Sequence, residues 1–462
     1  MRRFVSLAVA TSLAGCNLAP TYVRPAGAIP ATLPQLPGQA QTVAADEIGW
    51  RDFFVDPALR DTIALALENN RDLRLSAANV LQARAQSRVQ RADLLPTVNA
   101  GANATFTNNA TAAFGGAGGG NIEIYQANVG LSAFEIDLFG RVRNLAQASL
   151  QQYFATEEAQ RAARITLIGE VASAYLTMAG DQDQLRIAQD TLKSFAETLR
   201  LTTAQFRIGV ASELEQRQAD TNYQVARNDI AAITARIVQD QNALNLLAGT
   251  TVPANLLPSE LGTRAFTLDD LPAGVTSEVL QRRPDVLQAE RTLMAQNANI
   301  GAARAALFPR ISLTATLGTI STALSGLFGA GSDVWNVAPS ASLPLFDFGR
   351  RRGNIQLAEA QALGAVATYE RTLQVAFREV ADALAQRGTI GEQVSAREAR
   401  ANSASVAARL SDARYRAGVD SFLVSLDAQR TAYGAQQDLV TTRLLRANNL
   451  VTLYRALGGG LR

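Results

Sequence analysis

The segment FDFGRRRGNIQLAEAQ (residues 346–361) begins the stretch that decides the fold of this chain, and YRAGV (residues 415–419) ends it. From the end of FGR (residues 348–350) to YRAGV, roughly 67 residues contain no proline, which predicts one continuous helix on the order of 100 Å long. Arginine, glutamate and aspartate occur along its whole length. A charge inside lipid costs several kcal/mol, so this helix cannot cross a membrane. We expect it to stand in water beside other long helices.

The same stretch occurs a second time, earlier in the chain. FGR (residues 139–141) and FRIGV (residues 206–210) each lie 209 residues before their counterparts. LLP (residues 94–96) and LFP (residues 307–309) are instead 213 residues apart. Such constant spacing indicates a tandem duplication, and a duplication in sequence indicates that the fold consists of two similar structural units. We place the first repeat at residues 57–250, the second at residues 278–462, and a proline-rich linker at residues 251–277.

Each repeat is predicted to contain a helix, a β-hairpin, the long helix and a further helix. The first helix begins at Pro57 and runs up to Pro96, because proline marks both boundaries. Four glycines interrupt the two long helices and make a kink or a π-type irregularity plausible there: Gly169, Gly180, Gly388 and Gly391.

The composition excludes several function classes. The formal net charge is +2, which gives no indication of nucleic acid as a partner. The chain has no histidine and one cysteine, which removes histidine acid–base chemistry, Cys/His metal sites and intrachain disulfides. No pair of carboxylates stands in a recognisable catalytic motif. We therefore expect no enzyme, no catalytic residues, no metal and no cofactor.

The amino terminus explains the single cysteine. Two arginines precede a short apolar run at residues 4–13, which is the layout of an export signal and too short to span a bilayer. The following residues, LAGC (13–16), match the bacterial lipoprotein box, so we predict a signal peptide at residues 1–15 and a lipid on Cys16. A chance cysteine beside an ordinary cleavage site is the alternative. Residue 17 is asparagine, and the absence of aspartate there favours the outer membrane. A proline-rich tether is expected at residues 16–56.

Both hairpins show the period-two pattern of two-faced strands. Apolar and small polar residues alternate at 98–106 and 127–133, and again at 311–317 and 335–345. The phase slips near Tyr125 and near Phe134, which predicts a bulge or bend. A half-buried soluble sheet is the alternative, but no apolar partner sheet exists in the sequence, so the pattern favours a membrane barrel with a wet lumen. The side chains expected to face lipid are Val98, Phe106, Val129, Leu313, Val337 and Leu343.

Four strands cannot close a barrel, for which about eight are the practical minimum. The chain must therefore oligomerise. Two hairpins and two very long helices per chain give twelve strands when three chains assemble.

Several motifs together resemble a known family. With the lipoprotein box stand PTYVRP (residues 20–25), DLR (72–74), LLP (94–96) and YRAGVD (415–420). In this combination the chain resembles outer membrane efflux lipoproteins, the NodT-type members of the outer membrane factor family that includes TolC and OprM. The resemblance implies a mainly α fold with a membrane β-barrel, in which a homotrimer forms a twelve-stranded barrel on a long periplasmic α-helical barrel.

The function implied by the resemblance is a passive exit duct in the cell outer membrane. Such ducts serve an inner-membrane pump, usually of the resistance-nodulation-division (RND) type, through a periplasmic adaptor. Type I protein secretion is an alternative with the same architecture. A structural coiled-coil lipoprotein without a pore is another, but it would have no use for four amphipathic strands. Copper or silver is a further possible cargo, although the mature chain has only Met178 and Met294. The sequence names neither the exported compound nor the pump and adaptor.

Two turns are predicted to be periplasmic tips that meet the adaptor. Helix reversal explains a glycine in each turn, because glycine takes positive φ at low cost, but it explains neither the arginine before nor the valine after it. Two tips per chain would give a trimer six similar docking sites, matching an adaptor of six hairpins. The residues concerned are Arg207, Gly209, Val210, Arg416, Gly418 and Val419.

A constriction is expected just above the second tip. Leu423 and Asp427 are four residues apart and share one helical face. By resemblance they fall where the family places its periplasmic aperture. The first repeat has Leu214 and Gln218 at the matching positions, so the acid is confined to one copy. The alternative is that Asp427 pairs with Arg430 on a solvated helix.

Overall fold

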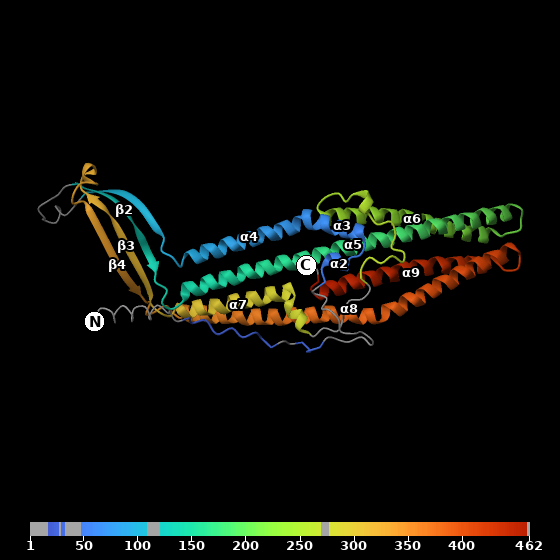
Figure 1. The fold of residues 1–462 in the computed structure, drawn as a ribbon. Coiled ribbons are helices and arrows are strands. Elements are labelled where there is room, and N and C mark those ends of the chain that lie inside the picture. The colour runs from blue at the N-terminus through green and yellow to red at the C-terminus, as the bar shows by residue number, and fades with distance from the viewer. Residues whose placement is uncertain (1–16, 27–28, 33–47, 109–120, 269–276, 460–462) are drawn as a thin grey trace. The chain divides into compact units, whose positions relative to one another are not determined.

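The structure is a computed structural model that describes residues 17–26, 29–32, 48–108, 121–268 and 277–459. The predicted lipidation site Cys16 and the signal peptide at residues 1–15 lie outside these residues. The elements follow in the order α2 (Trp50–Phe53), α3 (Pro57–Asn69), α4 (Arg71–Ala92), β1 (Val98–Asn108), β2 (Asn121–Glu135), α5 (Arg141–Arg207), α6 (Glu213–Ala248), η3 (Ala254–Leu256), η4 (Ser277–Arg282), α7 (Pro284–Ala305), β3 (Arg310–Ser321), η5 (Leu324–Gly326), β4 (Asp333–Ser342), α8 (Arg350–Arg416) and α9 (Phe422–Ala456), as labelled in Figure 1.

The chain forms two compact units, and each contains segments from both repeats. The unit that carries the sheet, called here the strand unit, comprises Met1–Ala26, Asn79–Thr156 and Gln288–Tyr369. The second, called here the helix unit, comprises Gly27–Ala78, Glu157–Leu287 and Glu370–Arg462.

Across the described residues, no helix combines the length and the apolar composition that crossing a bilayer requires.

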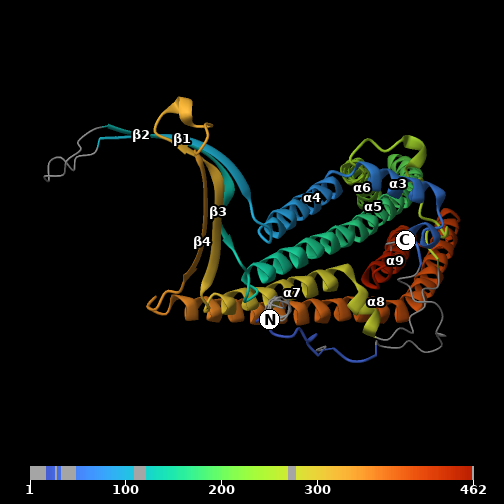
Figure 2. The same cartoon turned by 60° about the vertical axis from the view of Figure 1, so that its left-hand side comes forward.

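The strand unit holds one antiparallel sheet in the order β1-β2-β3-β4, seen as a curved layer in Figures 1 and 2. Val98 lies opposite Leu131, and Val129 lies opposite Leu317. Directly opposed residues point to the same side of a sheet, so the apolar positions of neighbouring strands share one face. Five of the six residues expected to face lipid lie on this face, and the sixth, Leu343, follows the end of β4: Val98, Phe106, Val129, Leu313 and Val337.

One of the two predicted irregularities in β2 is present. The register with β3 shifts between Leu131 and Phe134, and Ala133 has a positive φ of 52°, which together confirm a bulge there. The irregularity predicted near Tyr125 is wrong, because β1 and β2 pair without interruption from Asn108 to Val98. The apolar residues near Tyr125 occupy both faces of a regular strand.

The two long helices are continuous. Helices α5 and α8 contain 67 residues each, and neither is broken at the glycines that suggested a kink. A Cβ at Gly180 would lie 3.3 Å from Cδ2 of Leu444, and one at Gly169 would lie 3.2 Å from Cδ of Arg455. These two glycines therefore allow α9 to pack closely against α5.

The single helix predicted from Pro57 to Pro96 is wrong, since α3 ends at Asn69 and α4 starts at Arg71. The side chain of Asn70 accepts a hydrogen bond from the Leu73 amide at 2.8 Å and donates one to the Leu247 carbonyl at 2.8 Å. The equivalent break in the second repeat is at Arg283, whose guanidinium donates to the Ala456 carbonyl at 2.7 Å. Leu247 and Ala456 are themselves equivalent, so both repeats fix this break by the same contact.

A pair of carboxyl groups joins α5 to α6 in the first repeat only. Burial, and after it the charge and the hydrogen bond of the neighbouring Asp181, raise the pKa of Asp240 to about 6. Burial also raises the pKa of Asp181, and the guanidinium of Arg236, 3.2 Å away, opposes that rise. The residue equivalent to Asp240 in the second repeat is Asn449, which is buried and donates to the Ala383 carbonyl at 2.9 Å.

We expect Asp240→Asn, which installs the residue of the second repeat, to remove a pH dependence of stability. The pKa of Asp240 is raised from an ordinary value of 3.8 to about 6 on folding. As pH rises, the Asp240 carboxyl therefore loses its proton in the unfolded chain before it does so in the folded protein. The contribution of Asp240 to the free energy of unfolding falls as pH rises from about 4 to about 6, and above that it stays level. Thermal unfolding of both proteins between pH 4 and pH 7 measures this. An equal fall in the variant and in the parent protein would contradict the assignment.

Candidate functional site

The two predicted tips have the same backbone geometry. The amide of Gly209 donates to the Phe206 carbonyl at 3.0 Å, and that of Val210 donates to the Gln205 carbonyl at 2.9 Å. This pair of bonds is a Schellman motif, which requires a left-handed residue, and Gly209 has a φ of +73°. After α8, the amide of Gly418 donates to the Tyr415 carbonyl and the amide of Val419 donates to the Arg414 carbonyl, each at 2.9 Å.

Both tips leave an apolar side chain in solvent. Val210 is 72% exposed and Val419 is 63% exposed. A Cβ at Gly209 or at Gly418 would meet nothing within 4 Å. The structure thus places all the predicted tip residues on two open turns at the ends of α5 and α8.

The second tip carries a charged clamp that the first lacks. The guanidinium of Arg414 donates to both carboxylate oxygens of Asp420, at 2.6 and 2.8 Å. This contact holds the pKa of Asp420 below its usual range. The equivalent positions in the first repeat are Gln205 and Ala211, which cannot form an ion pair. The clamp fixes the chain between α8 and α9 at the second tip only.

A hydrogen bond links the two tips. The hydroxyl of Tyr415, on α8, donates to Oε1 of Gln205, on α5, at 2.7 Å. The ring of Tyr415 also contacts Phe422, whose side chain is buried against Ala219 and Leu426. Tyr415 belongs to the motif YRAGVD, but the sequence predicts no role for it, because only the fold shows that the two helix ends are adjacent.

The predicted aperture residues lie on the exposed side of α9. Leu423 is 62% exposed and Asp427 is exposed, whereas Phe422 and Leu426 on the opposite side are buried. No ion pair joins Asp427 to Arg430 in the part of the chain that the structure describes. Leu423 and Asp427 are therefore accessible to a neighbouring copy. Among the described residues, no basic side chain forms an ion pair with the Asp427 carboxylate.

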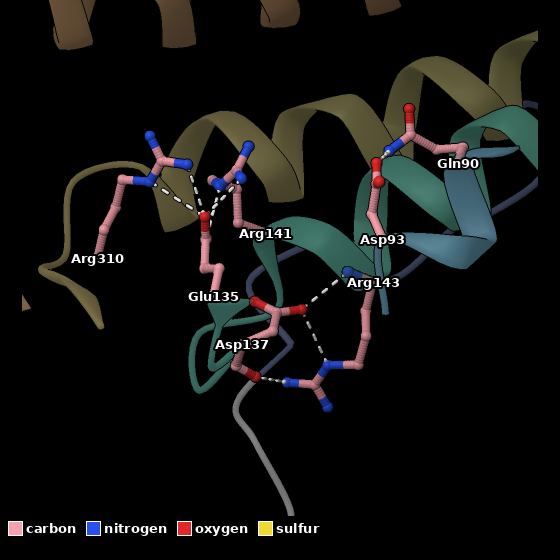
Figure 3. A network of polar contacts seen from close by, with 7 residues as sticks. All are labelled: Gln90, Asp93, Glu135, Asp137, Arg141, Arg143 and Arg310. Atoms are coloured by element: carbon pink, nitrogen blue, oxygen red, sulfur yellow. Dashed lines mark hydrogen bonds and ion pairs between the residues drawn. The ribbon is translucent and has the colours of Figure 1, made fainter. Parts of the chain in front are cut away.

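A polar network that the sequence analysis missed holds the base of the sheet (Figure 3). The carboxylate of Glu135, at the end of β2, accepts two hydrogen bonds from Arg141 at 2.7 and 2.8 Å. It also accepts a 2.7 Å bond from Arg310 at the start of β3. Next to it, Asp137 accepts from the backbone amide of Arg143 at 2.8 Å. These bonds fix the angle between the strands and the start of α5.

No group of three or more His, Cys, Asp and Glu side chains suited to a metal ion occurs among the described residues.

Comparison with known proteins agrees with this geometry. The family model described as outer membrane efflux protein matches residues 62–250 and 275–459. The chain is 45% identical to the solvent efflux pump outer membrane protein SrpC of Pseudomonas putida, over 97% of this chain and 96% of SrpC. It is 43% identical to the outer membrane protein OprJ of Pseudomonas aeruginosa, over 98% of this chain and 95% of OprJ.

Solved structures show the same fold. The open state of the outer membrane channel MtrE of Neisseria gonorrhoeae superposes with a TM-score of 0.87 at 37% identity, covering 97% of this chain and 99% of MtrE. A membrane protein of Pseudomonas aeruginosa gives a TM-score of 0.90 at 42% identity, covering 96% of this chain and all of its own.

A two-repeat, mainly helical fold with a membrane sheet is the fold of outer membrane efflux channels. This chain belongs to the outer membrane efflux protein family, and it is an outer membrane channel component of an efflux system. The predicted family, fold class, function and location are thereby confirmed. The family is one of channel-forming proteins and not a family of enzymes.

We expect Tyr415→Phe to loosen the tips. The variant removes only the hydroxyl that bonds Gln205, and it installs the aromatic residue that the first repeat has as Phe206. One hydrogen bond is worth about 0.5–1.5 kcal/mol net, so amide hydrogen exchange at residues 205–210 and 415–419 should be several times faster.

The matched control is Tyr433→Phe, which removes a 2.9 Å bond to Asp229 in the same unit, away from the turns. Exchange at the tips should be unchanged in this control. Equal exchange in the parent and in Tyr415→Phe would show that the bond does not hold the tips.

Proposed function

We propose that the protein is the passive exit duct of a tripartite pump, in which a homotrimer receives substrate from an inner-membrane RND-type transporter through a periplasmic adaptor. The cargo we propose is small toxic compounds, because relatives at 43–45% identity are named for solvent, toluene and antibiotic efflux. The same names favour efflux over type I protein secretion. We expect no enzymatic activity of its own.

The observation that carries this proposal is the pair of exposed Schellman turns. Two turns with the same backbone bonds, the same preceding arginine and the same exposed valine offer one partner two nearly equivalent contacts per chain. Apolar side chains that stand singly in solvent at a rigid turn suit insertion between helices of a partner hairpin. In a homotrimer these turns would provide six such contacts.

The proposal also includes a lipid anchor on Cys16. Acyl chains there would hold the amino terminus in the inner leaflet of the outer membrane. Because the barrel is itself an effectively permanent anchor, we propose that the lipid serves targeting and assembly more than retention.

Photo-crosslinking in cells tests the function. A crosslinking amino acid at Val210 or at Val419 should capture the adaptor encoded with the pump, and deletion of the gene should sensitise the cells to solvents or antibiotics. The same probe at Val238, which is 53% exposed on α6, is the control and should not capture the adaptor. If the tip probes capture only proteins of the cell exterior, or if deletion leaves resistance unchanged, the proposal fails.

We further propose that Leu423 and Asp427 form the closed aperture. Both are exposed one helical turn apart near the start of α9, and three copies would present an apolar ring beside a ring of carboxylates. An apolar constriction resists wetting, and a carboxylate ring favours cations. The resting pore would then be narrow and cation-selective, and it would open when the tips separate.

Conductance in planar bilayers tests the aperture. Leu423→Ser should raise the leak conductance, and Asp427→Ala should reduce the selectivity for cations. Leu214→Ser provides the control. Leu214 is the equivalent residue of the first repeat and is 65% exposed, but the residue one helical turn after it is Gln218 and not an acid. Parent-like conductance and selectivity in both aperture variants would place the constriction elsewhere.

A further inference from the structure

The amino-terminal tether lies against a groove between α7 and α8 in the strand unit, called here the second groove. The Asn297 side chain, on α7, donates a 2.7 Å hydrogen bond to the Pro20 carbonyl. A Cβ at Gly301 would lie 2.6 Å from Cβ of Ala19, so the tether approaches α7 where only a glycine leaves room for it. Four tether residues form one wall of the groove: Thr21, Tyr22, Val23 and Pro25. The second repeat therefore covers this groove with the chain's own backbone.

The first repeat has a groove at the equivalent place, between α4 and α5, called here the first groove. Its volume is about 700 Å³. The repeat spacings of 213 and 209 residues show that equivalent positions line both grooves. The matching pairs are Arg84 and Asn297, Ser87 and Ile300, Leu150 and Glu359, and Tyr153 and Ala362. The two grooves thus lie on equivalent sides of their helix pairs, but no described residue of the tether lines the first groove.

The first groove is basic. Its lining contains no carboxylate but four arginines: Arg84, Arg88, Arg91 and Arg143. The first three follow one face of α4 at spacings of four and three residues, and all three are exposed. No carboxylate of the described residues forms an ion pair with Arg84, Arg88 or Arg91. Like charges at these spacings destabilise a helix, so a bound anion would relieve their repulsion.

The second repeat shows how an arginine of this face is neutralised within the chain. Arg304, the equivalent of Arg91, forms a 3.0 Å ion pair with Glu359 of α8. The equivalent of Glu359 in the first repeat is Leu150. Arg91 therefore lacks the acid that neutralises its counterpart, and the first groove keeps its positive charge.

The first groove is unsuited to a second segment like the tether. Arg84 and Arg88 occupy the positions of Asn297 and Gly301, which bind the tether and leave room for it in the second groove. A guanidinium at the glycine position removes that room. Guanidinium groups instead bind phosphate oxygens well, because their planar N–H donors match phosphate geometry. The lining therefore suits a phosphate group rather than a polypeptide backbone.

The first groove begins at the base of the sheet. The backbone amide of Arg143 donates a 2.8 Å hydrogen bond to Asp137, which follows β2 (Figure 3). Leu94 also lines the groove, and β1 begins four residues later at Val98. Val98 is 65% exposed and belongs to the apolar face of the sheet. An apolar surface and an arginine-lined groove thus follow each other, which is the order of acyl chain and headgroup in a phospholipid.

We propose that the first groove binds the headgroup of an anionic phospholipid from the inner leaflet of the outer membrane. The phosphate accepts hydrogen bonds from Arg84, Arg88 and Arg91, and the acyl chains lie against the apolar face of the sheet. The inner leaflet is the one concerned, because the long helices lie in the periplasm. Basic pockets between helices at a membrane surface bind anionic headgroups in the same way. The inference goes beyond the proposed exit duct and depends neither on the cargo nor on the adaptor.

Native mass spectrometry tests the site. The protein is reconstituted in vesicles of phosphatidylethanolamine and phosphatidylglycerol and then extracted in mild detergent. The parent should retain phosphatidylglycerol in preference to phosphatidylethanolamine. Arg84→Asn combined with Arg88→Gln should weaken this binding about tenfold or more, because hydrogen bonds to a charged group are lost. Leu150→Glu, tested separately, removes no arginine but places a carboxylate beside Arg91, and it should weaken the binding similarly.

The matched control is Arg227→Asn combined with Arg371→Gln. It removes two exposed arginines from α6 and α8 in the helix unit and gives the same change of net charge. Phosphatidylglycerol binding should stay at the parent level in this control. Unfolding temperatures measured without added lipid should match across the proteins, which separates lost binding from misfolding.

Three results would overturn the proposal. One is equal retention of phosphatidylglycerol by the parent, the control and both groove variants, and another is equal retention of the two lipids by the parent. The third is displacement of phosphatidylglycerol by inorganic phosphate at the same concentration, because it would show a general anion site without acyl contacts. If the parent retains no lipid and a photo-crosslinking amino acid at Arg88 captures an acidic periplasmic protein in cells, the groove is a protein-binding site and the lipid assignment is wrong.

Discussion

The unpaired edges of a four-stranded sheet are the constraint on which the rest of this protein depends. Backbone N–H and C=O groups along the outer sides of β1 and β4 have no partner in their own sheet, and lipid cannot supply one. Each such group would cost several kcal/mol in hydrocarbon. Apolar and small polar residues alternate along the strands, so one face of the sheet suits lipid and the other suits water. A membrane channel built from this sheet must therefore use several chains.

The two repeats share their main backbone features and differ at a few charged positions. Both copies build the same helix break from Asn70 and Arg283, and the same Schellman turns at the tips. They diverge where one copy has a charge that the other lacks. The Arg414–Asp420 clamp and the Asp427 carboxylate belong to the second copy, and the Asp240 carboxyl to the first. Each chain therefore carries two tips, which are alike in backbone and unlike in charge.

Much of the fold could be predicted from the sequence, because its strongest signals are local. Freedom from proline predicted the long helices, period-two alternation predicted the strands, and a glycine after each long helix predicted the turns. The break at Asn70 could not be predicted, because no proline or glycine marks it and a distant carbonyl, that of Leu247, stabilises it. The same reason explains the missed roles of Tyr415 and Glu135. Each acts on a residue that is remote in sequence. The adjacent ends of α5 and α8 bring Tyr415 to Gln205, and the pairing of β2 with β3 brings Glu135 to Arg310.

The native mass of the protein, extracted from outer membranes in mild detergent and measured by native mass spectrometry, tests the central claim most directly. If the sheet edges are satisfied only by copies of the same chain, the dominant species should contain three chains and should persist on dilution. A stable monomer that still conducts ions in bilayers would contradict the account, because it would show that four strands can close a pore without a partner.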